Sequence, residues 1–172
     1  MKQLIARMGM MVFVALILSA FVSIPVQAGD KKMISGTKVT KRIVSRTNSF
    51  PADDPKHVLS QTVREDTITS VDPDWSDMVA IAYEQSDNLA GSGSHKGYLI
   101  VRHKSGDESY LTYQGFDKLS TQDKGSWEVL SEGEIQIIGG TGKFKDLRGG
   151  GTYKGKATPK GSLVNWEVTI EN

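Results

Sequence analysis

The chain contains no cysteine, and this absence excludes several kinds of chemistry at once. No disulfide can form, no thiol can act as a nucleophile, and no zinc site can use thiolate ligands. Histidine is scarce, with His57, His95 and His103 alone, and no two of them have the spacing of metal ligands. We therefore predict no metal site. We place His95 in a Gly/Ser turn and the other two on strands, and interpret each as a surface or wall residue.

The chain also lacks an excess of one charge and any long amphipathic helix. It has 21 basic and 20 acidic residues. Residues 1–28 contain Lys2 and Arg7 but no acid, so the rest of the chain has 19 basic residues against 20 acidic ones. This balance gives no support to nucleic-acid binding. Beyond residue 28 no apolar period of 3.6 residues extends over the length of a helix, which argues against βαβ folds.

The first 28 residues have the pattern of a secretory signal peptide. Lys2 and Arg7 form a basic start, residues 8–24 form an apolar core, and Val26-Gln27-Ala28 ends it with small residues around a cleavage point. We expect cleavage after Ala28, a periplasmic or secreted product, and one domain over residues 29–172 with no membrane span. The alternative is an uncleaved anchor, although an apolar run of about 17 residues is at the short limit for a span.

The remainder of the chain is predicted to form an all-β domain, an antiparallel barrel of about eight strands. Alternating or β-branched segments are separated by Gly, Pro, Asn and Asp, with a clear hairpin turn at residues 105–107. We predict turns or loops at residues 87–94 and 121–125. Closure with an early strand would protect the last strand from being an exposed edge. The expected strands are residues 37–47, 57–69, 78–85, 97–103, 108–116, 127–138, 152–158 and 163–170.

Residues 137–151 are the most distinctive stretch, because six of them are glycines and a short apolar insert interrupts them. A phosphate-binding loop would need a following helix and a Lys-Ser/Thr pair, and both are missing. We favour a turn between antiparallel strands. Phe144 and Leu147 are three residues apart, so one helical turn would place them on the same side, where they plug the barrel end. Gly133, inside the preceding strand, is expected to mark a bulge or coil point.

The segment 138–144, Ile-Gly-Gly-Thr-Gly-x-Phe, followed by Leu147-Arg148-Gly149, resembles the signature of dirigent proteins and is similar to the matching segment of allene oxide cyclases. The resemblance covers about 20 residues. It implies an eight-stranded, calycin-like antiparallel barrel around an apolar cavity, assembly into a homo-oligomer (a trimer in those families), and no cofactor. Glu134 lies where dirigent proteins tend to carry a glutamate.

The candidate site residues are aromatic and charged side chains on the predicted strands. Aromatic rings that line a barrel can hold a small hydrophobic ligand, and a desolvated Glu or Arg can polarise it. The alternative is that the aromatics fill the core and the charges face water, since a barrel of eight strands has little room. The ligand-binding candidates are Tyr83, Tyr98, Tyr113, Trp127 and Trp166, and the weaker catalytic candidates are Glu134, Glu84 and Arg102.

Three functions are consistent with this pattern. The first is an exported barrel that binds a small apolar ligand or a partner protein. The second is a cofactor-independent cyclase or isomerase of the allene oxide cyclase or dirigent type. The third is a structural envelope protein with a filled interior. A Glu or Arg buried in an open cavity would favour the second function, an apolar cavity the first, and a filled barrel with an apolar outer face the third.

Overall fold

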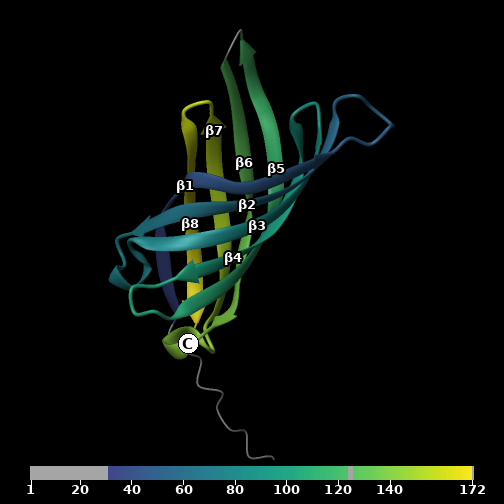
Figure 1. Cartoon of the computed structure of the whole chain (residues 1–172). Coiled ribbons are helices and arrows are strands. Elements are labelled where there is room, and N and C mark those ends of the chain that lie inside the picture. Colours follow the sequence, from purple (N-terminus) through teal and green to yellow (C-terminus); the bar gives the residue numbers. More distant parts are fainter. Residues whose placement is uncertain (1–30, 124–125, 172) are drawn as a thin grey trace, which may run out of the picture.

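The structure is a computed structural model that describes residues 31–123 and 126–171 (Figure 1). It contains eight β-strands, in the order that the sequence predicts, and two short 3₁₀ helices, of which only the turn at residues 142–144 was expected. The strands are β1 (Lys31–Ser49), β2 (His57–Ser70), β3 (Met78–Leu89), β4 (Ser92–Arg102), β5 (Glu108–Asp123), β6 (Ser126–Gly140), β7 (Arg148–Thr158) and β8 (Gly161–Glu171), and the helices are η1 (Pro73–Trp75) and η2 (Gly142–Phe144).

Each strand pairs antiparallel with its neighbours in sequence, and β1 pairs with β8 to close the ring. Residues 31–39 of β1 pair with residues 163–171 of β8, so the last strand has no free edge. In Figure 1, β1 to β4 cross steeply over β6 to β8, as expected when twisted strands close into a barrel. The predicted all-β, eight-stranded antiparallel barrel is therefore confirmed.

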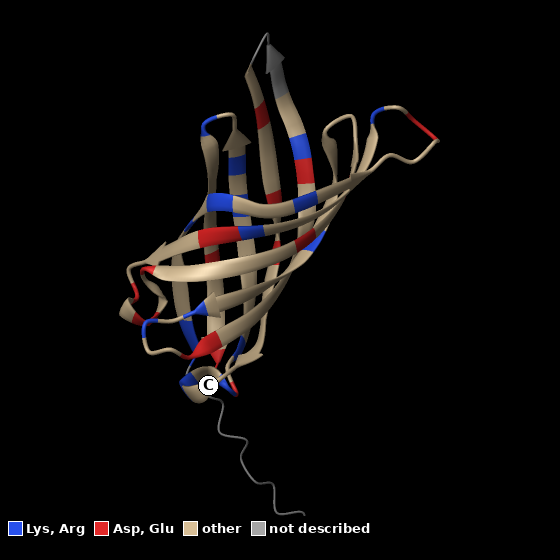
Figure 2. Cartoon of the chain, viewed as in Figure 1, with Lys and Arg blue, Asp and Glu red and all other residues tan. Residues whose placement is uncertain are grey.

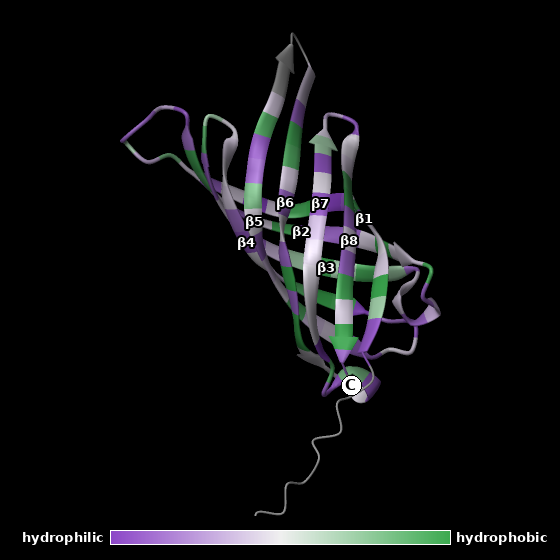
Figure 3. Cartoon of the chain, turned by 180° about the vertical axis from the view of Figure 1, so that it is seen from behind, coloured by the Kyte–Doolittle hydropathy of each residue, from purple (hydrophilic) through white to green (hydrophobic). Residues whose placement is uncertain are grey.

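Alternation along the strands separates an inner from an outer face. In β3, Ala80 and Ala82 are fully buried, whereas Val79 and Tyr83 are exposed on the other side. In β8, Trp166 and Val168 point inward. Figure 3 shows the alternation as short bands of opposite hydropathy along the strands. A side chain on one face of a strand thus shares that face with residues two positions away.

The two 3₁₀ helices close one end of the barrel. Trp75 of η1, Phe144 of η2 and the neighbouring Leu147 are each less than 5% exposed. The ring of His103 stacks on Phe144 at 3.7 Å between centroids, and Trp75 meets both rings edge-on. The apolar insert predicted to plug the barrel end does so, and the 90–91 turn and the long β5–β6 hairpin lie at the opposite end.

Two expected loops are strand instead. Residues 87–94 were predicted to be a turn, but β3 continues to Leu89 and β4 begins at Ser92. The turn is confined to Ala90 and Gly91, which both have positive φ, as in a tight two-residue hairpin. Residues 121–123, predicted to lie in a loop, continue β5. In residues 87–94 the polar composition belongs to strand ends, where Asp87 and Ser94 are exposed to water.

The bulge expected at Gly133 is absent from the ladder. Gly133 pairs regularly with Gly115, and the register shifts between β5 and β6 lie elsewhere, at residues 110–111 and 119–121. A Cβ at Gly133 would lie 2.5 Å from the hydroxyl of Tyr153. The glycine therefore provides room for an inward aromatic ring and does not mark an irregularity in the strand.

Charges of both signs alternate around the wall, as Figure 2 shows. Many pair across neighbouring strands, for example Lys31 with Glu171 at 2.7 Å and Arg102 with Glu108 at 3.1 Å. The expected signal peptide, residues 1–28, lies outside the described residues, so its cleavage and export remain predictions. Among residues 31–123 and 126–171, no helix has the length and apolar character needed to cross a bilayer.

Candidate functional site

A cavity of about 470 Å³ occupies the barrel interior above the plugged end. Its wall combines aliphatic side chains with several charged groups. The aromatic rings of Trp75 and Trp166, 6.4 Å apart, lie toward the plug, and Trp127 lines the cavity from β6. The aliphatic lining consists of Ile43, Ile68, Leu99, Val101, Leu111, Val129, Ile135, Val164 and Val168. The barrel is therefore not filled by its own side chains.

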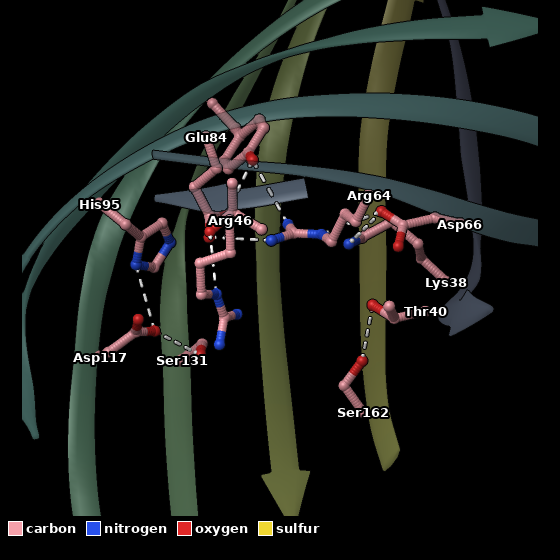
Figure 4. Close-up of polar contacts among 12 residues, drawn as sticks. Lys38, Thr40, Arg46, Arg64, Asp66, Glu84, His95, Asp117, Ser131 and Ser162 are labelled. Atoms are coloured by element: carbon pink, nitrogen blue, oxygen red, sulfur yellow. Dashed lines mark hydrogen bonds and ion pairs between the residues drawn. The ribbon is translucent and has the colours of Figure 1, made fainter. Parts of the chain in front are cut away.

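An arginine from β2 lies at the centre of the first polar group (Figure 4). The guanidinium of Arg64 is 2.8 Å from Oε1 of Glu84 and donates to the hydroxyl of Tyr113 at 3.3 Å. The same hydroxyl donates to Oε2 of Glu84 at 2.9 Å. Burial strongly raises the pKa of the Tyr113 hydroxyl, and Glu84 adds to this effect while Arg64 opposes it. Tyr113 therefore keeps its proton in the neutral pH range and donates a hydrogen bond to Glu84.

A second ion pair adjoins this group. Oδ2 of Asp66 accepts from Nζ of Lys38 at 3.0 Å and from Nε of Arg64 at 3.3 Å. Asp66 is fully buried, and the Lys38 side chain is 13% exposed. Burial, followed by the neighbouring Arg64 cation, lowers the pKa of the Lys38 ammonium against the opposing effect of Asp66. Two cations and two anions thus balance at this part of the wall.

The third polar group is built around His95 of β4. Its Nδ1 lies 3.1 Å from Oδ1 of Asp117, within ion-pair distance, although the ring N–H is not directed at that oxygen. Its Nε2 contacts the hydroxyl of Tyr153. Asp117 also accepts from Ser131 at 2.5 Å. Burial would raise the pKa of Asp117, but its contacts with His95 and Ser131 outweigh burial and hold the pKa below its usual value.

Glycines on the inner face make room for these rings. A Cβ at Gly97 would lie 2.3 Å from the Tyr113 hydroxyl, and a Cβ at Gly115 would lie 2.3 Å from that of Tyr153. No other residue type leaves this space, because real Cβ atoms do not approach so closely. The glycines of β4 to β6 therefore allow two tyrosines to reach across the interior toward His95, with the His95 and Tyr113 ring centroids 6.2 Å apart.

Three buried polar atoms beside the cavity have no hydrogen-bond partner among the described residues. They are Oδ1 of Asp66, an acceptor, Nε1 of Trp166, a donor, and Nδ1 of His95. Buried polar atoms in folded proteins are nearly always paired with protein or water, so each such atom calls for an explanation. Water, or the polar groups of a ligand, would satisfy these atoms.

Four of the predicted site residues line the cavity. Tyr113, Trp127, Trp166 and Glu84 all belong to its wall, from β5, β6, β8 and β3. The expectation that the charged side chains face water does not hold for Glu84, whose side chain is 17% exposed and paired with Arg64. Glu84 and Arg64 are therefore mostly buried charged groups that face the cavity.

The other four predicted residues lie on the outer face. Tyr83 is 48% exposed, Tyr98 stacks on Tyr110, and Arg102 pairs with Glu108 across the β4–β5 ladder. Glu134 lines a second groove, of about 970 Å³, on the outside of β1 to β6. The structure does not bring these four residues to the interior polar groups.

Sequence reasoning missed most of the charged wall. The residues concerned are Lys38, Asp66, His95, Asp117, Ser131 and Tyr153, and Arg64 was noted without being selected. For two of them a signal existed. Side chains two positions apart share a face of a strand, so Asp117 lies on the same inward face as Leu111 and Tyr113. By the same rule His95 lies on the same inward face as Leu99. His95, predicted to lie in a turn, is instead a buried strand residue.

The interior groups suit proton transfer. A carboxylate, an imidazole and a phenol follow one another at the cavity wall as Asp117, His95 and Tyr153. In the described part of the chain no three His, Asp or Glu side chains are placed to hold a metal ion together. The chemistry that the wall itself offers is hydrogen bonding and acid–base transfer.

Comparison with known proteins concerns the fold. No family model and no curated protein matches the chain. Among solved structures, that of a pterocarpan synthase dirigent protein overlaps with a TM-score of 0.48 and 15% sequence identity, over 85% of this chain and 97% of that one. The closed barrel of eight antiparallel strands is the architecture that the sequence resemblance implies, and the strand pairing confirms that architecture. At this identity the likeness assigns no substrate.

Proposed function

We propose that the barrel binds a small molecule with an apolar body and at least one hydrogen-bonding group in its interior cavity. The observation that carries this proposal is the cavity itself, about 470 Å³, with a surface that is mostly apolar and that also carries the polar groups described above. This volume lies within the range of roughly 300–1,000 Å³ that is usual for small-molecule sites. Asp66 and Trp166 supply the unpartnered acceptor and donor.

A second candidate function is a cofactor-independent isomerase or ring-closing enzyme acting in the same cavity. The contact of His95 with both Asp117 and Tyr153 favours it, because a base and an acid on one wall can remove and return a proton within one bound molecule. The Arg64–Glu84–Tyr113 group would orient an oxygen of that molecule. We also propose that the protein is exported to the periplasm or the medium, because residues 1–28 have the pattern of a signal peptide.

Native mass spectrometry of the protein from its own host's envelope fraction tests the binding proposal. We expect a mass excess of a few hundred daltons that is lost on denaturation. A probe experiment complements it, with 2-naphthalenemethanol titrated against the fluorescence of the cavity tryptophans. An apo mass together with no response to the probe would contradict the proposal.

Two neighbouring positions on β6 give a matched pair of variants. Val129 lines the cavity, whereas Leu130 is exposed on the outer face. Val129→Trp should abolish probe binding by filling the cavity, while Leu130→Trp should leave it unchanged. Equal binding by both variants would place the probe outside the barrel.

Turnover is tested by comparing the molecules that co-purify with wild type and with His95→Gln. If the barrel isomerises its ligand, the variant should carry the unreacted form, which has the same mass and a different retention time. Identical molecules in both preparations would support binding without turnover.

A further inference from the structure

The amine of Lys38 differs from the other paired lysines of the barrel. Its side chain is 13% exposed and lines the interior cavity. By contrast, the side chains of Lys31 and Lys104, which also form ion pairs, are 65% and 62% exposed. A lysine in this position meets whatever occupies the cavity, whereas the surface lysines meet water.

The surroundings of Lys38 allow it to lose its proton. Oδ2 of Asp66 accepts from both Lys38 and Arg64, so the carboxylate remains paired with Arg64 when Lys38 is neutral. The charged groups near the amine are Arg64 and Asp66 on β2 and Glu84 on β3. Burial and Arg64 lower the pKa of Lys38, which increases the fraction of nucleophilic amine near neutral pH.

We propose that Lys38 is a reactive amine that binds an aldehyde in the cavity by forming an imine. This inference rests on the proposed function, since the aldehyde must first enter the cavity. Because the surrounding wall is aliphatic and aromatic, the aldehyde it accepts has an apolar body.

The reaction is a balanced condensation. The lone pair of Nζ forms a bond to the carbonyl carbon, and the carbonyl oxygen takes up a proton to give a carbinolamine. Loss of the hydroxyl group as water, with the remaining nitrogen proton, leaves a C=N double bond, so amine and aldehyde yield imine and water. Asp66, which is fully buried and has a free Oδ1, is the carboxylate placed to relay protons during these steps.

Reductive trapping tests this inference on the full chain. The protein is incubated at neutral pH with 2-naphthaldehyde and sodium cyanoborohydride, digested, and mapped by mass spectrometry. We expect Lys38 to be modified several-fold faster than the average exposed lysine, because it lines the cavity that holds the aldehyde and burial lowers the pKa of its amine. Modification spread over the exposed lysines, with Lys38 no faster than they are, would overturn the inference.

Two variants provide the control. Lys38→Arg keeps the charge toward Asp66 and should remove the fast modification. Lys96→Arg, on the outer face of β4, should leave it unchanged. Since the site of modification is also read directly from wild-type peptides, the test does not depend on Lys38→Arg folding normally.

The non-reactive alcohol 2-naphthalenemethanol separates this inference from the proposed function. It should bind the cavity and protect Lys38 from the aldehyde. If the alcohol binds and Lys38 is not modified, the amine proposal is wrong while the cavity proposal stands. If the alcohol does not bind and Lys38 is not modified, both proposals are wrong.

Discussion

Replacing Arg64 with methionine should destabilise the barrel far more than the same replacement at a surface ion pair. Arg64 compensates two buried carboxylates, Glu84 at 2.8 Å and Asp66 at 3.3 Å. Removing one partner of a buried pair leaves an uncompensated charge, which costs roughly 3–5 kcal/mol. Arg102, 65% exposed and paired with Glu108, is the matched control, and its loss should cost about 1 kcal/mol or less.

Urea unfolding followed by tryptophan fluorescence measures both variants. Three tryptophans, two of which lie inside the barrel at its plugged end, report on the transition. The expected order of unfolding free energy is wild type, then Arg102→Met close to it, then Arg64→Met well below. An Arg64→Met protein within about 1 kcal/mol of Arg102→Met would refute the view that Arg64 neutralises buried carboxylates.

A double variant distinguishes lost charge compensation from lost packing. In Arg64→Met/Glu84→Gln the remaining pair of Lys38 and Asp66 is balanced, and the glutamine oxygen can still accept from Tyr113. We expect it to recover about 0.5–3 kcal/mol relative to Arg64→Met, the usual size of coupling between contacting residues. A double variant that is less stable than Arg64→Met would mean that packing around the guanidinium dominates.

Three further predictions concern other parts of the barrel. Gly133→Ala should lower the unfolding free energy by about 1–3 kcal/mol, because its Cβ would lie 2.1 Å from the backbone oxygen of Gln114, and a melting temperature equal to wild type would contradict this. Burial lowers the pKa of His103 below its ordinary value of 6.5, so the histidine of the unfolded chain gains a proton first and the protein should lose stability as the pH falls below about 6.5. When the unfolding free energy is measured between about pH 5 and 8, His103→Gln should show a smaller loss toward the acid end than wild type. Hydrogen bonds to Asp87 and Asp53 raise the pKa of His57, so its stabilising effect should be complete below pH 6.5 and disappear as the pH rises through the raised pKa. If the unfolding free energy of His57→Gln changes with pH in parallel with that of wild type up to about pH 8, this prediction is wrong.

Prediction of the interior from sequence failed most clearly on β2. Its two faces carry equal numbers of aliphatic residues. Leu59 and Val63 lie outside the barrel, whereas Val58 and the buried Ile68 share the inner face with Arg64. Alternating hydropathy identifies a strand, but it does not say which face is inner when polar groups are paired inside. Arg64 is tolerated there because Glu84 and Asp66, from β3 and its own strand, compensate its charge.

The pairing of His95 with Asp117 shows the same limit. The two residues are 22 positions apart, on strands whose polar ends resemble turn and loop sequence. Their contact depends on the β4–β5 register, in which His95 lies opposite Gly115, one inward position before Asp117. The register in turn follows from the hairpin turn at residues 103–107 and the buried Leu99 and Leu111, and sequence alone offered only the turn.

The amino-acid sequence by itself determined the fold class, the number and order of the strands, and the plug formed by Phe144 and Leu147, because each depends on local signals of alternation, turn residues and short spacing. Only the tertiary structure decided that the barrel is open inside and that its wall is charged. The space depends on glycines of β4 to β6 that face tyrosines of other strands, and the charges are stable only as partners across strands distant in sequence. A side chain's neighbours across a closed barrel are fixed by register and closure, and these are properties of the whole ring.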